Sequence, residues 1–243
     1  MLKCKCVILS SLFFGSFLFG KSQERSGGIF SLSADRQIEH NTLNGGKAFE
    51  RDMESLSLDS NFSLQNSLHF IHLFFVDTLS SFFEIELIEV PNNYLSCVDN
   101  HITVYPKGLY ESHLSLPVIN AKKIKKEKIK QLKTCVEKVN IDTIDYLFSM
   151  MLSYKMVPLH ASGGFGGAVI QANLTLGIIT MNEASVIVMN EYANSDLMLA
   201  LIKGVPIVNG LEIESLCYNA TQKLSNKIVR EMPRIKKKLA KLE

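Results

Sequence analysis

The sequence of 243 residues has no tryptophan and no Cys-x-x-Cys pair among its five cysteines. It also has no apolar run as long as the roughly 18–20 residues of a membrane-spanning helix. Without paired cysteines, a zinc ribbon or a thioredoxin-like site has no support, and the short apolar runs exclude a polytopic membrane protein. Hydrophobic residues make up 47% and charged residues 21% of the chain, which excludes wholesale disorder and indicates a globular domain.

The first residues have the pattern of an export signal. Residues 1–6 are basic and residues 7–20 are uncharged and mostly apolar. This pattern predicts a secretory signal peptide over residues 1–22, with cleavage after Gly20 or Ser22. No cysteine follows the apolar run, so lipidation is not expected, and an uncleaved anchor or a buried helix are the alternatives. We therefore expect a periplasmic, outer-membrane-associated or secreted protein.

The remaining chain divides by its hydrophobic pattern. Residues 23–62 are rich in Ser, Asn, Asp and Gly without a period, so we interpret them as a flexible linker. Residues 63–243 are predicted to form a single α/β (α+β) domain. The apolar segment 144–159 predicts a central strand, and alternation over 170–192 predicts a long antiparallel hairpin. The expected fold is a mixed sheet with this hairpin, packed by two or three helices.

The longest periodic segment ends the chain, where apolar residues from Ile213 to Leu242 recur every three or four positions. This spacing predicts a helix whose apolar face packs on the sheet and whose lysines face water. Pro233 should kink the helix, and we expect the part beyond Pro233 to project and to dock on a partner or membrane surface. The other predicted elements are helices at 64–82 and 129–139 and short strands at 84–90 and 101–105.

Positive charge is concentrated in residues 121–138 and 223–243, each with eight basic and two acidic residues. The simplest explanation is a solvated helix face. The functional hypothesis is a surface that meets anionic lipid headgroups, an anionic glycan or an acidic protein. Nucleic acid is not expected, because no aromatic platform is interleaved with the lysines. The candidate binding residues are Lys122, Lys123, Lys125, Lys126, Lys130, Arg234, Lys236, Lys237 and Lys238.

Motifs for chemistry are weak. His69 and His72 lie three positions apart on a predicted helix, as two metal ligands do, but no third ligand is evident, so core or rim histidines are favoured. The glycine-rich segment 161–167 lacks the lysine and the helix that follow phosphate loops, which favours a mobile loop. Ser162 lacks the strand-to-helix elbow of a hydrolase nucleophile. We therefore expect no catalytic residue, no metal and no cofactor.

Three cysteines remain after removal of the predicted signal, and export would place them in an oxidising compartment. Cys97 and Cys135 are the expected pair, because each lies near the end of an element beside the predicted sheet. Their disulfide would close a loop of about 38 residues and contribute roughly 3–4 kcal/mol. Cys217 would then be left unpaired.

The order of elements is similar to that of several small bacterial envelope proteins. A helix through Val136 leads to Asp145 and a buried strand, a hairpin follows over 168–194, and a terminal helix covers 211–239. This order resembles the curli-secretion lipoprotein, the lipoprotein activators of penicillin-binding proteins and related accessory lipoproteins. The hairpin and basic helix also resemble the sialic-acid-associated haemagglutinin lipoproteins of gastric bacteria. The resemblance implies an assembly or binding factor without catalysis.

The leading hypothesis is therefore an exported, non-enzymatic accessory or assembly factor of the bacterial cell envelope that binds an envelope protein. The alternative is a surface adhesin or anionic-glycan-binding module that uses the lysine-rich helices, with peripheral membrane contact compatible with either. An envelope hydrolase has no supporting group of residues. An aromatic cluster beside the lysines would favour a glycan, and a smooth apolar groove would favour a protein partner. The sequence leaves the oligomeric state open.

Overall fold

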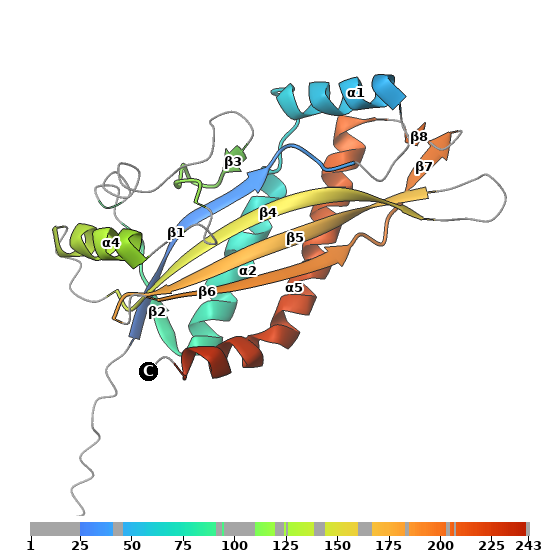
Figure 1. Cartoon of the computed structure of the whole chain (residues 1–243). Coiled ribbons are helices and arrows are strands. Elements are labelled where there is room, and N and C mark those ends of the chain that lie inside the picture. The colour runs from blue at the N-terminus through green and yellow to red at the C-terminus, as the bar shows by residue number, and fades with distance from the viewer. Residues whose placement is uncertain are drawn as a thin grey trace, which may run out of the picture.

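The computed structural model describes residues 25–40, 46–90, 94, 110–119, 124, 126–138, 144–159, 167–182, 185–202, 205–206 and 208–241. These residues form a mixed eight-stranded sheet with helices against both of its faces (Figure 1). The predicted fold class is thereby confirmed.

The strands and helices differ widely in length. The strands are β1 (Arg25–Asp35), β2 (Ile85–Leu87), β3 (Tyr110–Ser112), β4 (Tyr146–Leu159), β5 (Gly167–Thr180), β6 (Ser185–Asn194), β7 (Leu199–Ile202) and β8 (Val205–Pro206). The helices are α1 (Gly46–Leu58), α2 (Gln65–Phe83), α4 (Lys126–Lys138) and α5 (Gly210–Leu239).

Strand β4 lies in the middle of the sheet, as predicted for residues 144–159. It runs parallel to β1 on one side and antiparallel to β5 on the other. Its pairing with β5 extends from Tyr146–Thr180 to Leu159–Gly167, and β6 returns antiparallel to β5. The long antiparallel hairpin predicted over 170–192 is therefore present as β5 and β6.

The flexible linker predicted over residues 23–62 is contradicted by the structure. Residues 25–35 form β1, which pairs with β2, β3 and β4, and all of its residues except the first and last are buried. Residues 46–58 form α1, which buries Phe49, Met53 and Leu56. The glycines Gly27 and Gly28 that indicated a linker instead stand where a side chain would meet its neighbours, and Ser26, Ser31 and Ser33 are buried in the strand.

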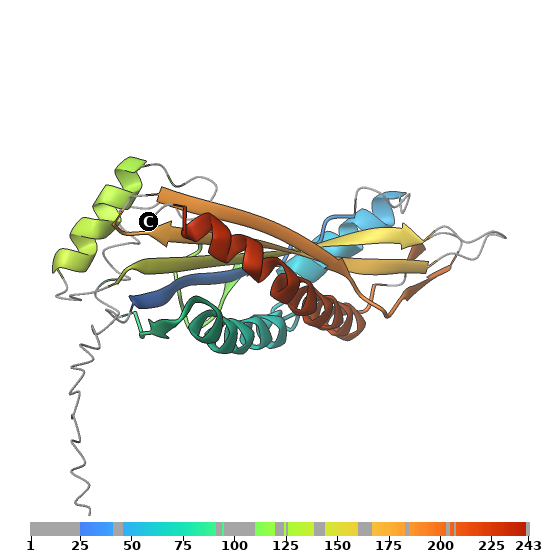
Figure 2. The same ribbon diagram turned by 90° about the horizontal axis from the view of Figure 1, so that it is seen from below.

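The sheet separates two hydrophobic cores. On one face, α1, α2 and α5 cover the larger core, which includes Phe148 and Ile178. On the opposite face, α4 covers a smaller core near one end of the sheet, which includes Leu147 and Ile179 (Figure 2). Neighbouring residues of one strand thus enter different cores, as the pleat of a strand requires.

Helix α5 has the predicted apolar face, with Leu216, Ala220, Leu224 and Ile228 buried. The prediction that its end projects from the domain is wrong. Figure 1 shows the last part of the helix turning toward the end of α2. Ile235 is only 2% exposed and Leu239 only 6%. The apolar stripe continues beyond Pro233 because the start of the sheet and the end of α2 offer it an apolar surface.

Several predicted features lie outside the described residues. They are the signal peptide over residues 1–22, the strand at 101–105, residues 161–166 of the glycine-rich segment, and residues Cys97, Lys122, Lys123, Lys125 and Leu242. Within the part of the chain that the structure describes, no helix is both long enough and apolar enough to cross a membrane.

Candidate ligand-binding pocket

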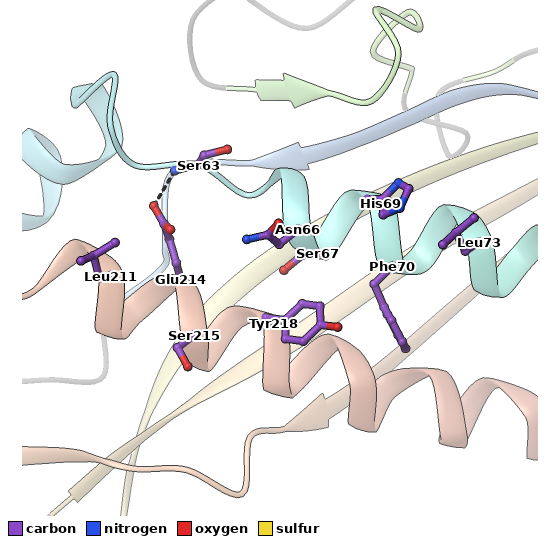
Figure 3. Close-up of a pocket in the computed structure, with 10 residues that line it drawn as sticks. All are labelled: Ser63, Asn66, Ser67, His69, Phe70, Leu73, Leu211, Glu214, Ser215 and Tyr218. Atoms are coloured by element: carbon purple, nitrogen blue, oxygen red, sulfur yellow. Dashed lines mark hydrogen bonds between the residues drawn. The ribbon is translucent and has the colours of Figure 1, made fainter.

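A pocket of about 490 Å³ lies between the N-terminal halves of α2 and α5 (Figure 3). Most of its side chains are polar, and three are aliphatic or phenyl groups. The lining residues are Ser63, Asn66, Ser67, His69, Phe70, Leu73, Leu211, Glu214, Ser215 and Tyr218. The volume and the mixed lining are within the usual range of small-molecule sites.

Helical periodicity explains why these residues meet. The lining residues of the two helices follow the same spacing of three, four and seven positions. They are residues 63, 66, 67 and 70 at the start of α2 and residues 211, 214, 215 and 218 on α5. Residues at this spacing share one side of a helix. On both helices this side lies next to the buried stripe, so the two helices pack through their apolar residues and leave the polar ones around an open space.

Two carboxylates fix the start of α2 at the edge of the pocket. The Glu214 side chain accepts a hydrogen bond from the Ser63 backbone N–H at 2.7 Å. Glu111, on β3, accepts from the Ser63 hydroxyl and from the Leu64 backbone N–H, both at 2.7 Å. Negative charge at a helix N-terminus is favourable because the backbone N–H groups there lack partners within the helix. The N-terminal end of α2 is therefore held in place by side chains from β3 and α5.

The aromatic side chains of Phe70 and Tyr218 face each other between the helices, as Figure 3 shows. Their ring centroids lie 5.7 Å apart with an interplanar angle of 76°, an edge-to-face arrangement. Both rings are half-buried, so part of each ring faces the pocket. The site thus combines aromatic surface with the amide of Asn66, the carboxylate of Glu214 and several hydroxyl groups.

Below the pocket, polar groups tie α5 to the sheet. The hydroxyl of Tyr154 on β4, which is fully buried, lies 2.9 Å from the hydroxyl of Thr221. Thr221 in turn donates to the Cys217 carbonyl at 2.8 Å. Burial raises the pKa values of the Tyr154 hydroxyl and the Cys217 thiol well above their usual range. Both groups are neutral at physiological pH, and we assign them a structural role.

The histidines predicted as core or rim residues have an unexpected neighbour. His69 is exposed and lines the pocket, and His72 is half-buried one turn further along α2. His113, which follows β3, places its ring centroid 5.7 Å from that of His69 and 4.9 Å from that of His72. Sequence patterns did not reveal His113 because no local pattern links it to α2. Among the described residues, no group of three or more His, Cys, Asp or Glu side chains could hold a metal ion.

The predicted basic binding residues do not line this pocket. Lys130 is exposed on α4, against the opposite face of the sheet from α5. Arg234, Lys236, Lys237 and Lys238 are exposed near the end of α5, where Lys236 pairs with Glu84 at 2.9 Å. From Glu214 to Lys236 is roughly 30 Å along the helix at 1.5 Å per residue. Lys126 belongs to α4 by its backbone. The described lysines of α4 and those near the end of α5 thus lie on helices that pack against opposite faces of the sheet.

The described cysteines agree in part with the predicted pairing. Cys217 is a free, buried thiol. Cys135 is disulfide-bonded, and its partner is outside the described residues. The pairing of Cys97 with Cys135 therefore stays a prediction.

Comparisons with known proteins show no family for this chain. No family model matches it, and no curated protein does. Among solved structures, it is similar to a Helicobacter pylori protein provisionally described as a neuraminyllactose-binding hemagglutinin homologue, with 12% identity over 92% of each chain and a TM-score of 0.37. A similarity at this level carries no conclusion about fold or function, which are therefore argued from the chain's own residues.

Proposed function

We propose that this chain is a non-enzymatic binding protein of the bacterial cell envelope, and that the pocket between α2 and α5 binds an uncharged sugar residue of a glycan. The observation that supports this most is the aromatic pair Phe70 and Tyr218 beside amide, carboxylate and hydroxyl side chains in one open pocket. The location in the envelope rests on the predicted signal peptide.

The chemistry of the lining suits a sugar ring. A pyranose has an apolar C–H face, which packs against aromatic rings, and a rim of hydroxyl groups that donate and accept hydrogen bonds. Phe70 and Tyr218 supply the ring surface. Asn66 supplies both donors and acceptors, and the Glu214 carboxylate supplies acceptors. A purely apolar ligand would leave these polar groups without partners when it displaced water, which costs binding energy.

The charges favour a neutral sugar over an anionic one. Glu214 is the only carboxylate in the lining, and no lysine or arginine among the described residues is part of it. A negatively charged sugar would face Glu214 without a lysine or arginine in the lining to balance it. The anionic-glycan hypothesis therefore requires a different surface, namely Lys236 to Lys238 at the far end of α5.

A binding role is also supported over hydrolysis of glycosidic bonds. Glycosidases typically use two carboxyl groups on opposite sides of the scissile bond. Among the described residues, the pocket lining offers Glu214 alone, and that carboxylate is already hydrogen-bonded to the Ser63 backbone.

A protein partner is the second candidate, as the accessory-factor hypothesis predicts. Leu73 and Leu211 at the edge of the pocket are 50% and 77% exposed. Exposed apolar side chains beside a cavity are typical of protein contacts. The polar floor of the pocket favours the glycan, and a binding experiment with matched variants separates the two.

The test is binding of the purified mature protein to an array of neutral and sialylated oligosaccharides, followed by calorimetry with the best ligand. We expect saturable binding of a neutral sugar. Tyr218→Ala and Asn66→Ala should each weaken it by about tenfold, equivalent to roughly 1.4 kcal/mol. The control Tyr192→Ala removes a 55% exposed ring on β6 and should leave the affinity unchanged.

Two results would overturn the proposal. The first is the absence of glycan binding, or binding that survives Tyr218→Ala in a folded protein. The second is selective binding of sialylated sugars that is lost when Lys236, Lys237 and Lys238 are changed to Gln, which would assign the function to the basic end of α5. If glycans fail and Leu211→Asp abolishes a defined protein complex, the accessory-factor hypothesis replaces the glycan.

A further inference from the structure

Strand β6 forms an edge of the sheet (Figure 1). It pairs with β5 in an unbroken antiparallel register from Ser185 to Asn194, and among the described residues no strand pairs with its outer side. Backbone N–H and C=O groups without partners on a long, regular edge are a template for another extended chain. An edge of this length therefore needs either protection or a partner.

Hydrogen bonds at one end of β6 show which of its residues face outward. The backbone N–H of Ser195, just after the strand, donates to a carbonyl of β5 at 2.8 Å, so this group faces β5. Three residues earlier, the Tyr192 carbonyl accepts from Nζ of Lys227 on α5 at 3.1 Å, so it faces away from β5. Because backbone groups alternate along an antiparallel strand, those of Val188 and Asn190 face outward as well.

Protection of this edge is confined to its last residues. There, Nζ of Lys227 lies 4.0 Å from the centroid of the Tyr192 ring and 3.3 Å from Oε2 of Glu191. Residues 185–190 contain no lysine and no proline, and their register has no bulge. Lysine, proline and bulges are the features that commonly keep an edge strand from pairing. This stretch of the edge is therefore available to a partner strand.

A groove of about 130 Å³ lies between β6 and the later turns of α5. Its lining consists of residues 187–191 of β6 together with Glu231, Arg234, Ile235 and Lys238 of α5. With Lys227, the charged residues of α5 are spaced by four, three and four positions, so they share one side of the helix. This row spans roughly 16 Å of helix, about the length of five strand residues. A groove beside an edge strand can hold the side chains of a peptide that adds to that edge.

The charges of the groove favour an acidic partner. Glu191 and Glu231 are each in an ion pair, with Lys227 at 3.3 Å and with Arg234 at 3.5 Å. Lys238 adds a further positive charge to the lining. Two copies of β6 paired antiparallel in one continuous sheet would place both basic α5 helices on the same side, next to each other. Repulsion between them opposes a second copy, whereas an acidic segment is attracted.

The two faces of the edge differ in character. Ile187 and Met189 pack against the larger core under α5, whereas Val186 packs against the smaller core on the opposite face. Val188 and Tyr192 share the face of Val186, because side chains alternate along a strand. The side chains of an added strand would alternate in the same way. A matching segment therefore has acidic side chains toward α5 and apolar side chains beside Val188 and Tyr192.

We propose that β6 binds an extended segment of a partner protein as an additional strand, and that this segment alternates acidic and apolar residues. Hydrogen bonds to the outward backbone groups of Val188 and Asn190 hold the segment, and Arg234 and Lys238 select its acidic side chains. The inference goes beyond the glycan pocket, whose lining on α5 comes from residues 211–218.

The experiment is fluorescence anisotropy of a labelled eight-residue peptide of alternating valine and glutamate, titrated with the purified mature protein. We expect saturable binding to a monomeric protein. The same peptide methylated on its backbone nitrogens should bind at least about tenfold more weakly, because it has lost its hydrogen-bond donors. A peptide of alternating valine and lysine should also bind at least about tenfold more weakly, because its charge is reversed.

Matched variants locate the site on the protein. Val188→Pro removes an outward N–H and should weaken binding of the valine–glutamate peptide by at least about tenfold, whereas Val188→Thr keeps that N–H and should bind as the wild type does. The double variant Arg234→Gln/Lys238→Gln should weaken binding by about threefold to tenfold. The control Lys130→Gln removes an exposed charge from α4 and should leave the affinity unchanged.

The methylated peptide and the charge variant keep the test decisive if Val188→Pro fails to fold, which circular dichroism would reveal. The proposal is overturned if the wild type does not bind the valine–glutamate peptide, or if the methylated peptide binds as tightly. A protein that sediments as a dimer, and that Val188→Pro converts to a folded monomer, would also overturn it by assigning the edge to a second copy. No sugar is present, so the outcome is independent of the glycan proposal.

Discussion

Two neighbouring glycines show how tightly β1 is enclosed. A methyl group on Gly27 would lie 2.8 Å from Cε2 of Phe148, and one on Gly28 would lie 2.6 Å from Cγ2 of Val90. Real side-chain carbons do not approach each other so closely. Glycine is therefore required at these positions by the neighbours on both faces of the sheet, and not by a turn.

We expect Gly28→Ala to lower the free energy of unfolding by roughly 1–3 kcal/mol, because the added methyl group must displace Val90 or move the strand. Urea denaturation followed by circular dichroism measures the effect. The double variant Gly28→Ala/Val90→Ala should recover part of the loss by making room. A single variant as stable as the wild type would show that β1 is not enclosed in this way.

The neighbouring histidines His72 and His113 should make the stability of the protein depend on pH. The pKa values of His72 and His113 are lowered in the folded state, so below the usual value of about 6.5 the unfolded chain binds more protons than the folded one. The free energy of unfolding should therefore fall as the pH decreases from about 7 toward 5. We expect the free energy of unfolding to fall less steeply with decreasing pH in His113→Gln than in His40→Gln. Equal slopes in the two variants would contradict this prediction.

At the scale of elements, the last turns of α5 complete the larger core. Leu239 lies with Phe83, Tyr146 and Phe148 around a small cavity of about 100 Å³, and Ile235 is buried one turn earlier. Pro233 removes one backbone hydrogen-bond donor and allows the bend that brings these residues onto the start of the sheet. The end of the helix is therefore part of the folded domain and not a docking arm.

Changing Ile235 to Ala should lower the free energy of unfolding by about 2–4 kcal/mol, as expected for a buried large side chain. The nearby variant Lys237→Ala changes an exposed residue and should stay within about 0.5 kcal/mol of the wild type. Thermal and urea denaturation measure both. If the two variants are equally stable, the end of α5 does not pack as described.

Elements with a clear hydrophobic period were predictable, and those governed by contacts across the chain were not. The alternation in β5 and the spacing along α5 depend on local sequence, so both were found. Strand β1 was missed because glycine and serine are typical of linkers. The two glycines are explained by contacts with residues distant in the sequence, Phe148 and Val90. The pocket and His113 were missed for the same reason, since the sequence does not show that α2 lies beside α5 and β3.

At the scale of the whole molecule, the second core is small and depends on a helix that is covalently tied. Cys135 on α4 is disulfide-bonded and only 1% exposed, beside Ile129 and Leu132. A crosslink from α4 to a distant segment would hold this helix on a face of the sheet where few other described residues cover it.

We predict that Cys135 pairs with Cys97. Proteolysis without reductant, followed by mass spectrometry, should yield a linked peptide that contains both. Reduction should lower the free energy of unfolding by roughly 3–4 kcal/mol, since the bond closes a loop of about 38 residues. Buried Cys217 should resist thiol reagents until the protein unfolds. A linkage from Cys135 to a different cysteine would contradict the prediction.

The place of β1 in the sheet has a consequence for the speed of folding. This strand is synthesised first, yet its main partner is β4, and the hydrogen bond from the Ser26 backbone to Asp145 joins residues 119 positions apart. Pairings between such distant residues raise the contact order of a chain and slow its search for the native state. We therefore expect that in a nascent chain the edge of β1 that faces β4 stays unpaired until residues 146–159 have emerged, and during that interval this edge is open to pairing with other chains.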